Sequence, residues 1–122
     1  MEKKKILLVD DSNTVLMMER MLLNGSGFQL FTAMNGEEAI EAALAERPDL
    51  ILMDVIMPKM NGFEACKQLR QLDETREIPI ILVTTRGEYE NVEQGYASGC
   101  DDYVTKPINN LELSSKIRNL IG

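Results

Sequence analysis

The feature that most constrains the fold is an alternation between short apolar runs and longer segments with helical periodicity. Strands that alternate strictly with helices predict a parallel sheet, because each return to the same edge requires a right-handed crossover through a covering helix. We therefore expect a three-layer α/β fold. Its strands are predicted at 6–9, 28–33, 50–53, 78–83 and 103–104, and its helices at 13–23, 37–46, 63–72, 89–98 and 109–121.

Composition narrows the classes of function. A chain of 122 residues has the size of one domain, and we assign residues 1–122 to a single unit. The 13 basic and 20 acidic residues give a net charge of -7, which argues against binding to nucleic acid or to an anionic membrane. The absence of histidine excludes imidazole bases and histidine metal ligands. Cys66 and Cys100 lack the spacing of a zinc site and are expected to be reduced and structural.

The apolar segments of the sequence give two further expectations, one about localisation and one about the core. The apolar run at 6–9 is too short for a signal peptide or a membrane span, so we expect a cytoplasmic protein without membrane insertion. The helix at 13–23 is expected to turn one apolar stripe toward the core, with its methionines as core filling. This stripe consists of Val15, Met18, Met21 and Leu22.

Carboxylates end two of the apolar runs. Asp10 and Asp11 follow the run at 6–9, and Asp54 follows the run at 50–53. In a doubly wound sheet of strand order 2-1-3-4-5, the first and third strands flank the switch point, where open α/β sheets bind their ligands. We therefore expect the three carboxylates to meet at the carboxyl edge of the sheet.

The same edge is predicted to gather a hydroxyl and an amine, because Thr84 ends the fourth strand and Lys106 follows the fifth. Three adjacent carboxylates repel one another unless a cation compensates them. Mg²⁺ fits best, since it prefers oxygen ligands and keeps several waters. The Asp54 carboxylate can then act as a nucleophile toward a phosphoryl group, while Lys106 and Thr84 stabilise the charge that develops on the phosphoryl oxygens.

Four motifs occur in a fixed order along the chain: Val9-Asp10-Asp11-Ser12, the segment 53–62, Val83-Thr84-Thr85, and the segment 99–107 that ends in Lys106-Pro107. Together they are highly specific. The chain resembles a response-regulator receiver domain of the CheY-like superfamily over essentially its whole length. This resemblance implies a flavodoxin-like fold of five parallel strands flanked by five helices. Because no output region follows the last helix, it implies a single-domain response regulator.

The resemblance also implies a role for each acidic residue. Asp54 accepts a phosphoryl group from a histidine kinase or a phosphotransfer protein. Asp10 and Asp11 hold Mg²⁺, together with Asp54 and the backbone carbonyl of Ile56. The protein is then a signalling switch of a two-component phosphorelay and not an enzyme, because it catalyses only its own phosphorylation and dephosphorylation.

The remaining motif residues have implied roles in switching. Thr84 is the switch hydroxyl that moves to the phosphoryl oxygen, and Lys106 is the amine that binds the phosphoryl group. Tyr103 turns inward after Thr84 moves, and the altered surface formed by residues 88–121 binds a downstream target protein. The Lys106–Pro107 peptide bond is expected to be cis.

Three residues are expected to tune the lifetime of the phosphoryl group. Receivers often carry a small residue directly after the switch hydroxyl, whereas Thr85 is bulkier and narrows the access to the phosphoryl group. Ile56 and Arg86 each stand two positions beyond a site residue and flank the route of an attacking water.

Two other functions stay open at the level of sequence. The chain could be a small Mg²⁺-dependent phosphohydrolase with an aspartyl nucleophile, although that class typically has a second acid at the position of Ile56. It could also be a receiver-like binding module that has lost phosphorylation, although its site residues are intact. We expect a monomer or a weak dimer.

Overall fold

The computed structural model describes residues 3–85 and 89–122. Within these residues, five strands alternate with five helices, as the apolar pattern predicts. The elements are β1 (Lys5–Val9), α1 (Asn13–Leu23), β2 (Gln29–Ala33), α2 (Gly36–Glu46), β3 (Leu50–Asp54), α3 (Gly62–Gln71), β4 (Ile80–Thr85), α4 (Tyr89–Ser98), β5 (Asp102–Lys106) and α5 (Asn110–Ile121).

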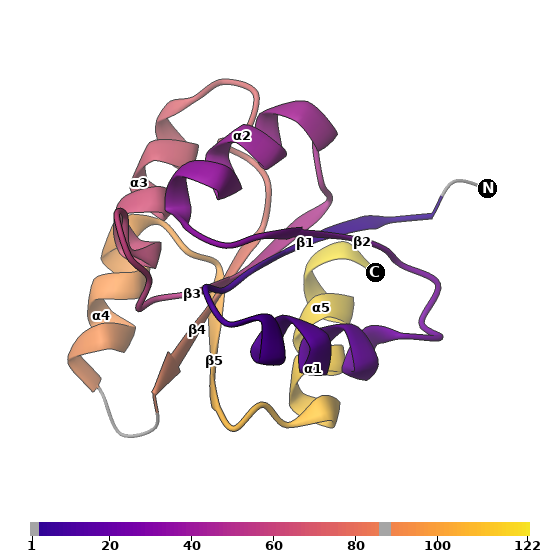
Figure 1. Cartoon of the computed structure of the whole chain (residues 1–122). Coiled ribbons are helices and arrows are strands. Elements are labelled where there is room, and N and C mark those ends of the chain that lie inside the picture. The colour runs from indigo at the N-terminus through magenta and orange to yellow at the C-terminus, as the bar shows by residue number, and fades with distance from the viewer. Residues whose placement is uncertain (1–2, 86–88) are drawn as a thin grey trace.

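All five strands are parallel and lie in the order β2-β1-β3-β4-β5, which confirms the predicted doubly wound sheet. Helices α2, α3 and α4 lie on one side of the sheet, and α1 and α5 lie on the other (Figure 1). Successive side chains of a strand point to opposite faces. Leu7 and Met53 therefore pack with α2 and α3, whereas Leu8 and Leu52 pack with α1 and α5.

The loop after β3 is held closely against the strand that it leaves. Asn61 caps α3 in a capping box, in which Glu64 donates its backbone N–H to the Asn61 side chain and accepts the N–H of Asn61. The backbone N–H of Gly62 donates to the carbonyl oxygen of Val55 at 2.8 Å. A Cβ at position 62 would lie 2.4 Å from the carbonyl oxygen of Asp54, so only glycine permits this approach.

The predicted core stripe of α1 is wrong. The buried residues of this helix are Leu16, Glu19 and Leu23, whereas the side chains of Met18 and Met21 are 56% and 71% exposed. The two stripes are neighbours on a helix of 3.6 residues per turn, so periodicity alone separates them poorly. The prediction chose the stripe with more apolar residues, and the helix instead buries a carboxyl group and exposes its methionines.

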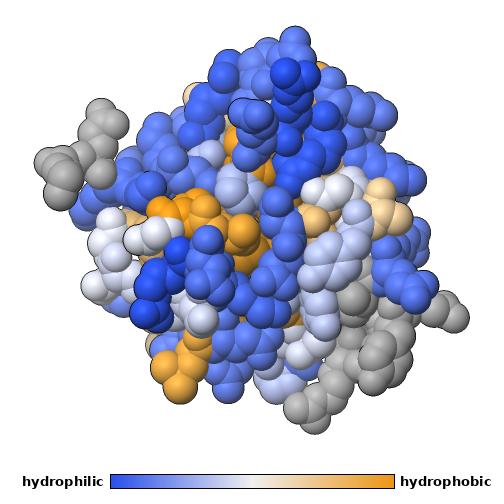
Figure 2. All heavy atoms as spheres, turned by 180° about the vertical axis from the view of Figure 1, so that it is seen from behind, coloured by the Kyte–Doolittle hydropathy of each residue, from blue (hydrophilic) through white to orange (hydrophobic). Residues whose placement is uncertain are grey.

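Most of the surface seen from behind is hydrophilic, in keeping with a chain of which 27% of the residues are charged (Figure 2). Figure 2 also shows apolar side chains exposed in small patches. None of the helices that the structure describes is long and apolar enough to cross a membrane. Cys66 and Cys100 are both buried free thiols, as predicted.

Candidate functional site

Three carboxylates meet at the carboxyl edge of the sheet. Val9 of β1 pairs with Met53 of β3, so the residues that follow them, Asp10 and Asp54, emerge side by side. Asp10, Asp11 and Asp54 each offer an oxygen atom within 4.8 Å of the others. Asp10 and Asp54 are 1% and 6% exposed, while Asp11 is exposed. The structure thus brings together the three acids that the strand order predicts to meet.

In the described part of the chain, the backbone donates a hydrogen bond to one oxygen of Asp10 and none to the other. The N–H of Ser12 donates to Asp10 Oδ1 at 2.9 Å, and the N–H of Asp10 itself donates to the carbonyl of Ala33 at 3.1 Å. Asp10 Oδ2 is buried and has no hydrogen-bond partner among the described residues. A buried acceptor without a partner is unfavourable, so this oxygen is suited to a cation that the site would bind.

Lys106 places an ammonium group beside two of these acids. Its Nζ lies 3.3 Å from Asp54 Oδ1 and 3.6 Å from Asp10 Oδ2. Burial alone would lower the pKa of Lys106, but the charges of Asp54 and Asp10 outweigh it and the pKa is raised. The ammonium therefore stays charged. The Lys106–Pro107 bond is cis, as predicted.

The two buried acids at this edge, Asp10 and Asp54, hold their protons more strongly than exposed carboxyl groups do. Burial, followed by the charge of Asp10, raises the pKa of Asp54 to about 6. Burial also raises the pKa of Asp10. One cation among three acids leaves an excess of negative charge, and a divalent ion would compensate it.

Thr84 supplies the hydroxyl at this edge. It follows Val83, which pairs with Asp54 in the sheet, so Thr84 lies one residue beyond the level of that acid on the next strand. The side chain is 3% exposed, and its Oγ1 has no hydrogen-bond partner among the residues that the structure describes. A buried hydroxyl without a partner is free to donate to a group that enters the site.

Comparison with known proteins agrees with this geometry. The family profile of the response regulator receiver domain matches residues 6–118. The chain belongs to this family. One relative of the receiver is the alkaline phosphatase synthesis transcriptional regulatory protein PhoP of Bacillus subtilis, which is 40% identical over 97% of this chain and 48% of PhoP. Protein PilH of Pseudomonas aeruginosa is 38% identical over 97% of this chain and 98% of PilH.

Solved structures show the same fold. The receiver domain of a sensor histidine kinase from Pseudomonas aeruginosa PAO1 superposes with a TM-score of 0.91, with 29% sequence identity and coverage of 99% of both chains. That domain has a magnesium ion coordinated in its active-site cleft. The present receiver spans about half the length of the first curated relatives that it matches.

The predicted aromatic switch residue of the receiver, Tyr103, is half-buried on β5. Its ring packs edge-on against Tyr96, with 6.0 Å between centroids, and Lys116 Nζ lies 4.8 Å from the ring centroid. Lys116 also donates to the carbonyl of Tyr103 and lies 3.2 Å from Asp102. The sequence analysis did not single out Lys116. Its spacing from Glu112, with which it pairs at 3.5 Å along α5, was the available signal.

The tuning residues are described only in part. Ile56 is 65% exposed just after β3, which is compatible with a place beside the route of an attacking water. Arg86 lies outside the described residues, and so does the side chain of Thr85. Glu19, which the sequence analysis missed, lies in the interior near Asp10, Asp54 and Lys106, whose charges all act on it.

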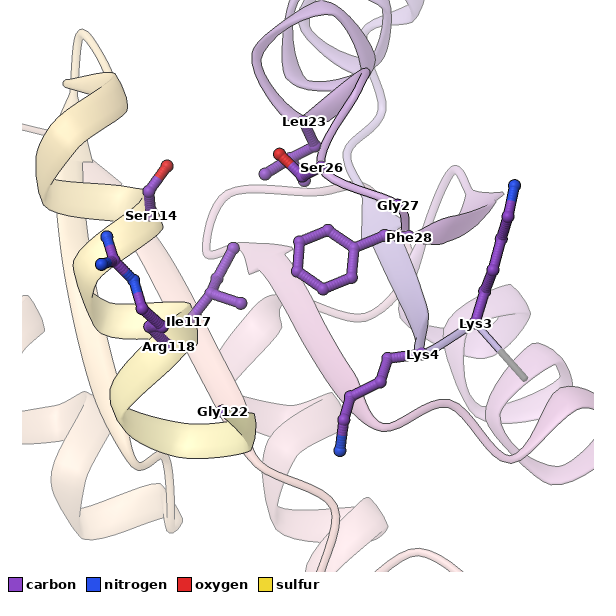
Figure 3. A pocket seen from close by; sticks show the side chains of 10 residues that line it. All are labelled: Lys3, Lys4, Leu23, Ser26, Gly27, Phe28, Ser114, Ile117, Arg118 and Gly122. Atoms are coloured by element: carbon purple, nitrogen blue, oxygen red, sulfur yellow. The ribbon is translucent and has the colours of Figure 1, made fainter. Parts of the chain in front are cut away.

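A hollow of about 620 Å³ lies at the opposite end of the receiver from the acids. Leu23, Phe28 and Ile117 line it between α5 and the segments that lead into β1 and β2 (Figure 3). Lys4 and Arg118 also line it. It contains neither a carboxylate cluster nor a buried polar group without a partner among the described residues, so the candidate site is the acidic edge and not this hollow.

Proposed function

We propose that this receiver domain is a phosphorylation switch of a two-component system, in which Asp54 accepts a phosphoryl group from a histidine kinase or a phosphotransfer protein. The observation that carries the proposal is the meeting of Asp54 with Asp10, Asp11, Lys106 and Thr84 at one edge of the sheet. These groups combine a nucleophile, a site for a cation, a fixed ammonium and a free hydroxyl. We assign residues 1–122 to this one domain.

The acidic cluster fits Mg²⁺. A small hard cation suits three carboxylate oxygens within 4.8 Å of one another, a buried acceptor that receives no hydrogen bond from the described residues, and an excess of negative charge. Asp10, Asp11, Asp54 and the backbone carbonyl of Ile56 would hold it. When bound, the ion neutralises charge on the phosphoryl oxygens. The magnesium ion of the kinase receiver supports this assignment.

Asp54, Lys106 and Thr84 have different roles in the transfer of the phosphoryl group. A carboxylate oxygen of Asp54 forms a bond to phosphorus, while the bond from phosphorus to the donor's leaving atom breaks and its electron pair stays with that atom. Lys106 draws the phosphoryl oxygens toward its ammonium, and Thr84 donates its hydroxyl to one of them. Because the pKa of Asp54 is about 6, the nucleophile is ionised at neutral pH.

The output of the switch is proposed to be a protein contact on the surface of residues 88–121, of which residue 88 lies outside the described part. Thr84, on β4, neighbours Thr105 of β5, and Tyr103 lies two residues earlier on that strand. A movement of Thr84 therefore acts on the strand that carries Tyr103. A downstream protein that distinguishes the two positions of this aromatic residue would read the state of Asp54.

Intact mass provides the test. Incubation with phosphoramidate and Mg²⁺ is expected to add the mass of one phosphoryl group to the wild type, and Asp54→Asn is expected to gain none. Glu41→Gln, a change at an exposed acid of α2, serves as the matched control and is expected to behave as the wild type does. Failure of the wild type to gain mass would contradict the proposal and favour a binding module that has lost phosphorylation. Steady release of phosphate from small phosphomonoesters would instead indicate a phosphohydrolase.

Ile56→Asn is expected to shorten the lifetime of the phosphoryl group. The exposed Ile56 side chain offers water no hydrogen bond, whereas an amide can orient a water toward phosphorus, so we expect autodephosphorylation to become about tenfold faster. Arg86→Ala is expected to change the same rate without abolishing phosphorylation. Decay of the phosphorylated mass over time measures both, and decay rates equal to that of the wild type would remove the tuning role.

A further inference from the structure

A second hollow of the receiver, of about 330 Å³, opens between α1 and the segment that follows β5. Its walls are mostly apolar. Val15, Met18 and Leu22 line it from the helix, and Pro107 and Ile108 line it from the other side. Part of the rim is formed by exposed methionine, a flexible side chain that adapts its shape to different ligands.

One acidic residue lines this apolar space. Glu19 lines the hollow and is 1% exposed, and its Oε1 has no hydrogen-bond partner among the described residues. Lys106 lines the hollow too, but its ammonium is engaged by Asp54 and Asp10 at 3.3 and 3.6 Å. The lysine therefore does not satisfy the carboxyl group. A buried polar atom without a partner is rare in folded proteins, and here it belongs to a residue that lines a cavity.

We propose that this hollow binds a small organic amine, whose apolar body lies between α1 and Pro107 and whose N–H donates to Glu19. The volume falls in the range of small-molecule sites, which are mostly apolar with a few placed polar groups. An amine supplies the missing donor and forms a charge-assisted hydrogen bond with a carboxylate. The net charge of -7 favours a cation over an anion.

The charges around Glu19 agree with a cationic ligand. Asp10 at the end of β1 and Asp54 at the end of β3 both disfavour its ionised form, and Lys106 at the end of β5 favours it. Burial, followed by the charge of Asp10, raises the pKa of Glu19 to about 8. A bound ammonium would add a second positive charge and hold the group as a carboxylate.

Occupancy of this site is coupled to phosphorylation, and this step rests on the proposed function. Lys106 lines the hollow and also contacts Asp54, so a ligand that shifts Lys106 changes the site that receives the phosphoryl group. By linkage, phosphorylation must change the affinity for the amine by the same factor. The binding itself needs no phosphoryl group and is testable without one.

The test uses hexylamine, hexanol and hexanoate, which share one alkyl chain and differ in the head group. Each is titrated into the unphosphorylated full chain with saturating Mg²⁺, and binding is followed by amide NMR shifts. Hexylamine is expected to saturate with shifts confined to α1 and residues 106–108, about tenfold tighter than hexanol, and hexanoate is expected not to bind. Glu19→Gln is expected to remove the preference for the amine, and Glu41→Gln to keep it.

Three results would overturn the proposal. Equal affinity for the amine and the alcohol would show that Glu19 contributes nothing. A preference that survives in Glu19→Gln would place the amine elsewhere, as would competition between hexylamine and Mg²⁺ for the acids at Asp10 and Asp54. Failure of the phosphorylation test alone leaves this proposal standing, because the titration is carried out without a phosphodonor.

Discussion

Glu19→Gln is expected to make the protein more stable than the wild type above pH 8, by about 5 kcal/mol. The ordinary pKa of this carboxyl is 4.5, and burial in the fold raises it to about 8. Between these values the folded state holds a proton that the unfolded chain has released, so the free energy of unfolding falls as the pH rises. Below pH 4.5 Glu19 is protonated in both states and does not destabilise the fold. Above pH 8 it is ionised in both states, and its destabilising effect on the fold has reached its full size.

Urea unfolding at a series of pH values measures this effect. Asp54, whose pKa is raised to about 6, gives the wild type a similar slope in the acid range, so the difference between wild type and Glu19→Gln isolates Glu19. The difference is expected to grow from pH 4.5 to pH 8 and then to level off. Glu41→Gln, on the exposed face of α2, is expected to show no such growth. A constant difference between wild type and Glu19→Gln at all pH values would contradict the assignment.

Glu19 also shows where prediction from the sequence ends. The alternation of apolar runs and helical segments was sufficient to predict a parallel sheet and its layers, and the order 2-1-3-4-5 came from the known arrangement of doubly wound sheets. The face of α1 was not predictable in the same way. A charged residue normally lies on the solvent side of a helix, and methionine normally lies in the core. This rule would place Glu19 outside and Met18 and Met21 inside. Here the methionines are exposed beside an open hollow, and the acid that lines the same hollow is buried.

The acidic site was predictable for a different reason. Asp10, Asp54 and Thr84 each stand at the carboxyl end of a strand, and strand order alone brings such residues to one edge. What the sequence could not supply is the state of each group. The unpartnered oxygen of Asp10, the raised pKa of Asp54 and the free hydroxyl of Thr84 arise from burial, which depends on the whole fold.

Lys106→Met is expected to slow phosphorylation of Asp54 by phosphoramidate about 100- to 1000-fold, the usual cost of removing one fixed group that stabilises developing charge. Its ammonium lies 3.3 Å from Asp54 Oδ1, where the phosphoryl oxygens would gather. The initial rate of mass gain measures the loss. Lys67→Met removes an exposed lysine of α3 and is expected to keep the wild-type rate. A rate for Lys106→Met within a few fold of the wild type would rule out this role.

The dependence on pH separates an electrostatic role of Lys106 from a merely structural one. The charge of Lys106 lowers the pKa of Asp54 and so partly opposes the rise caused by burial and by Asp10. Without it, Asp54 holds its proton to a higher pH, and only the ionised carboxylate attacks phosphorus. The pH at which phosphorylation reaches half its maximum should therefore lie higher in Lys106→Met than in the wild type at the same concentration of Mg²⁺. A slower reaction with an unmoved midpoint would mean that Lys106 acts on the shape of the site and not on its charge.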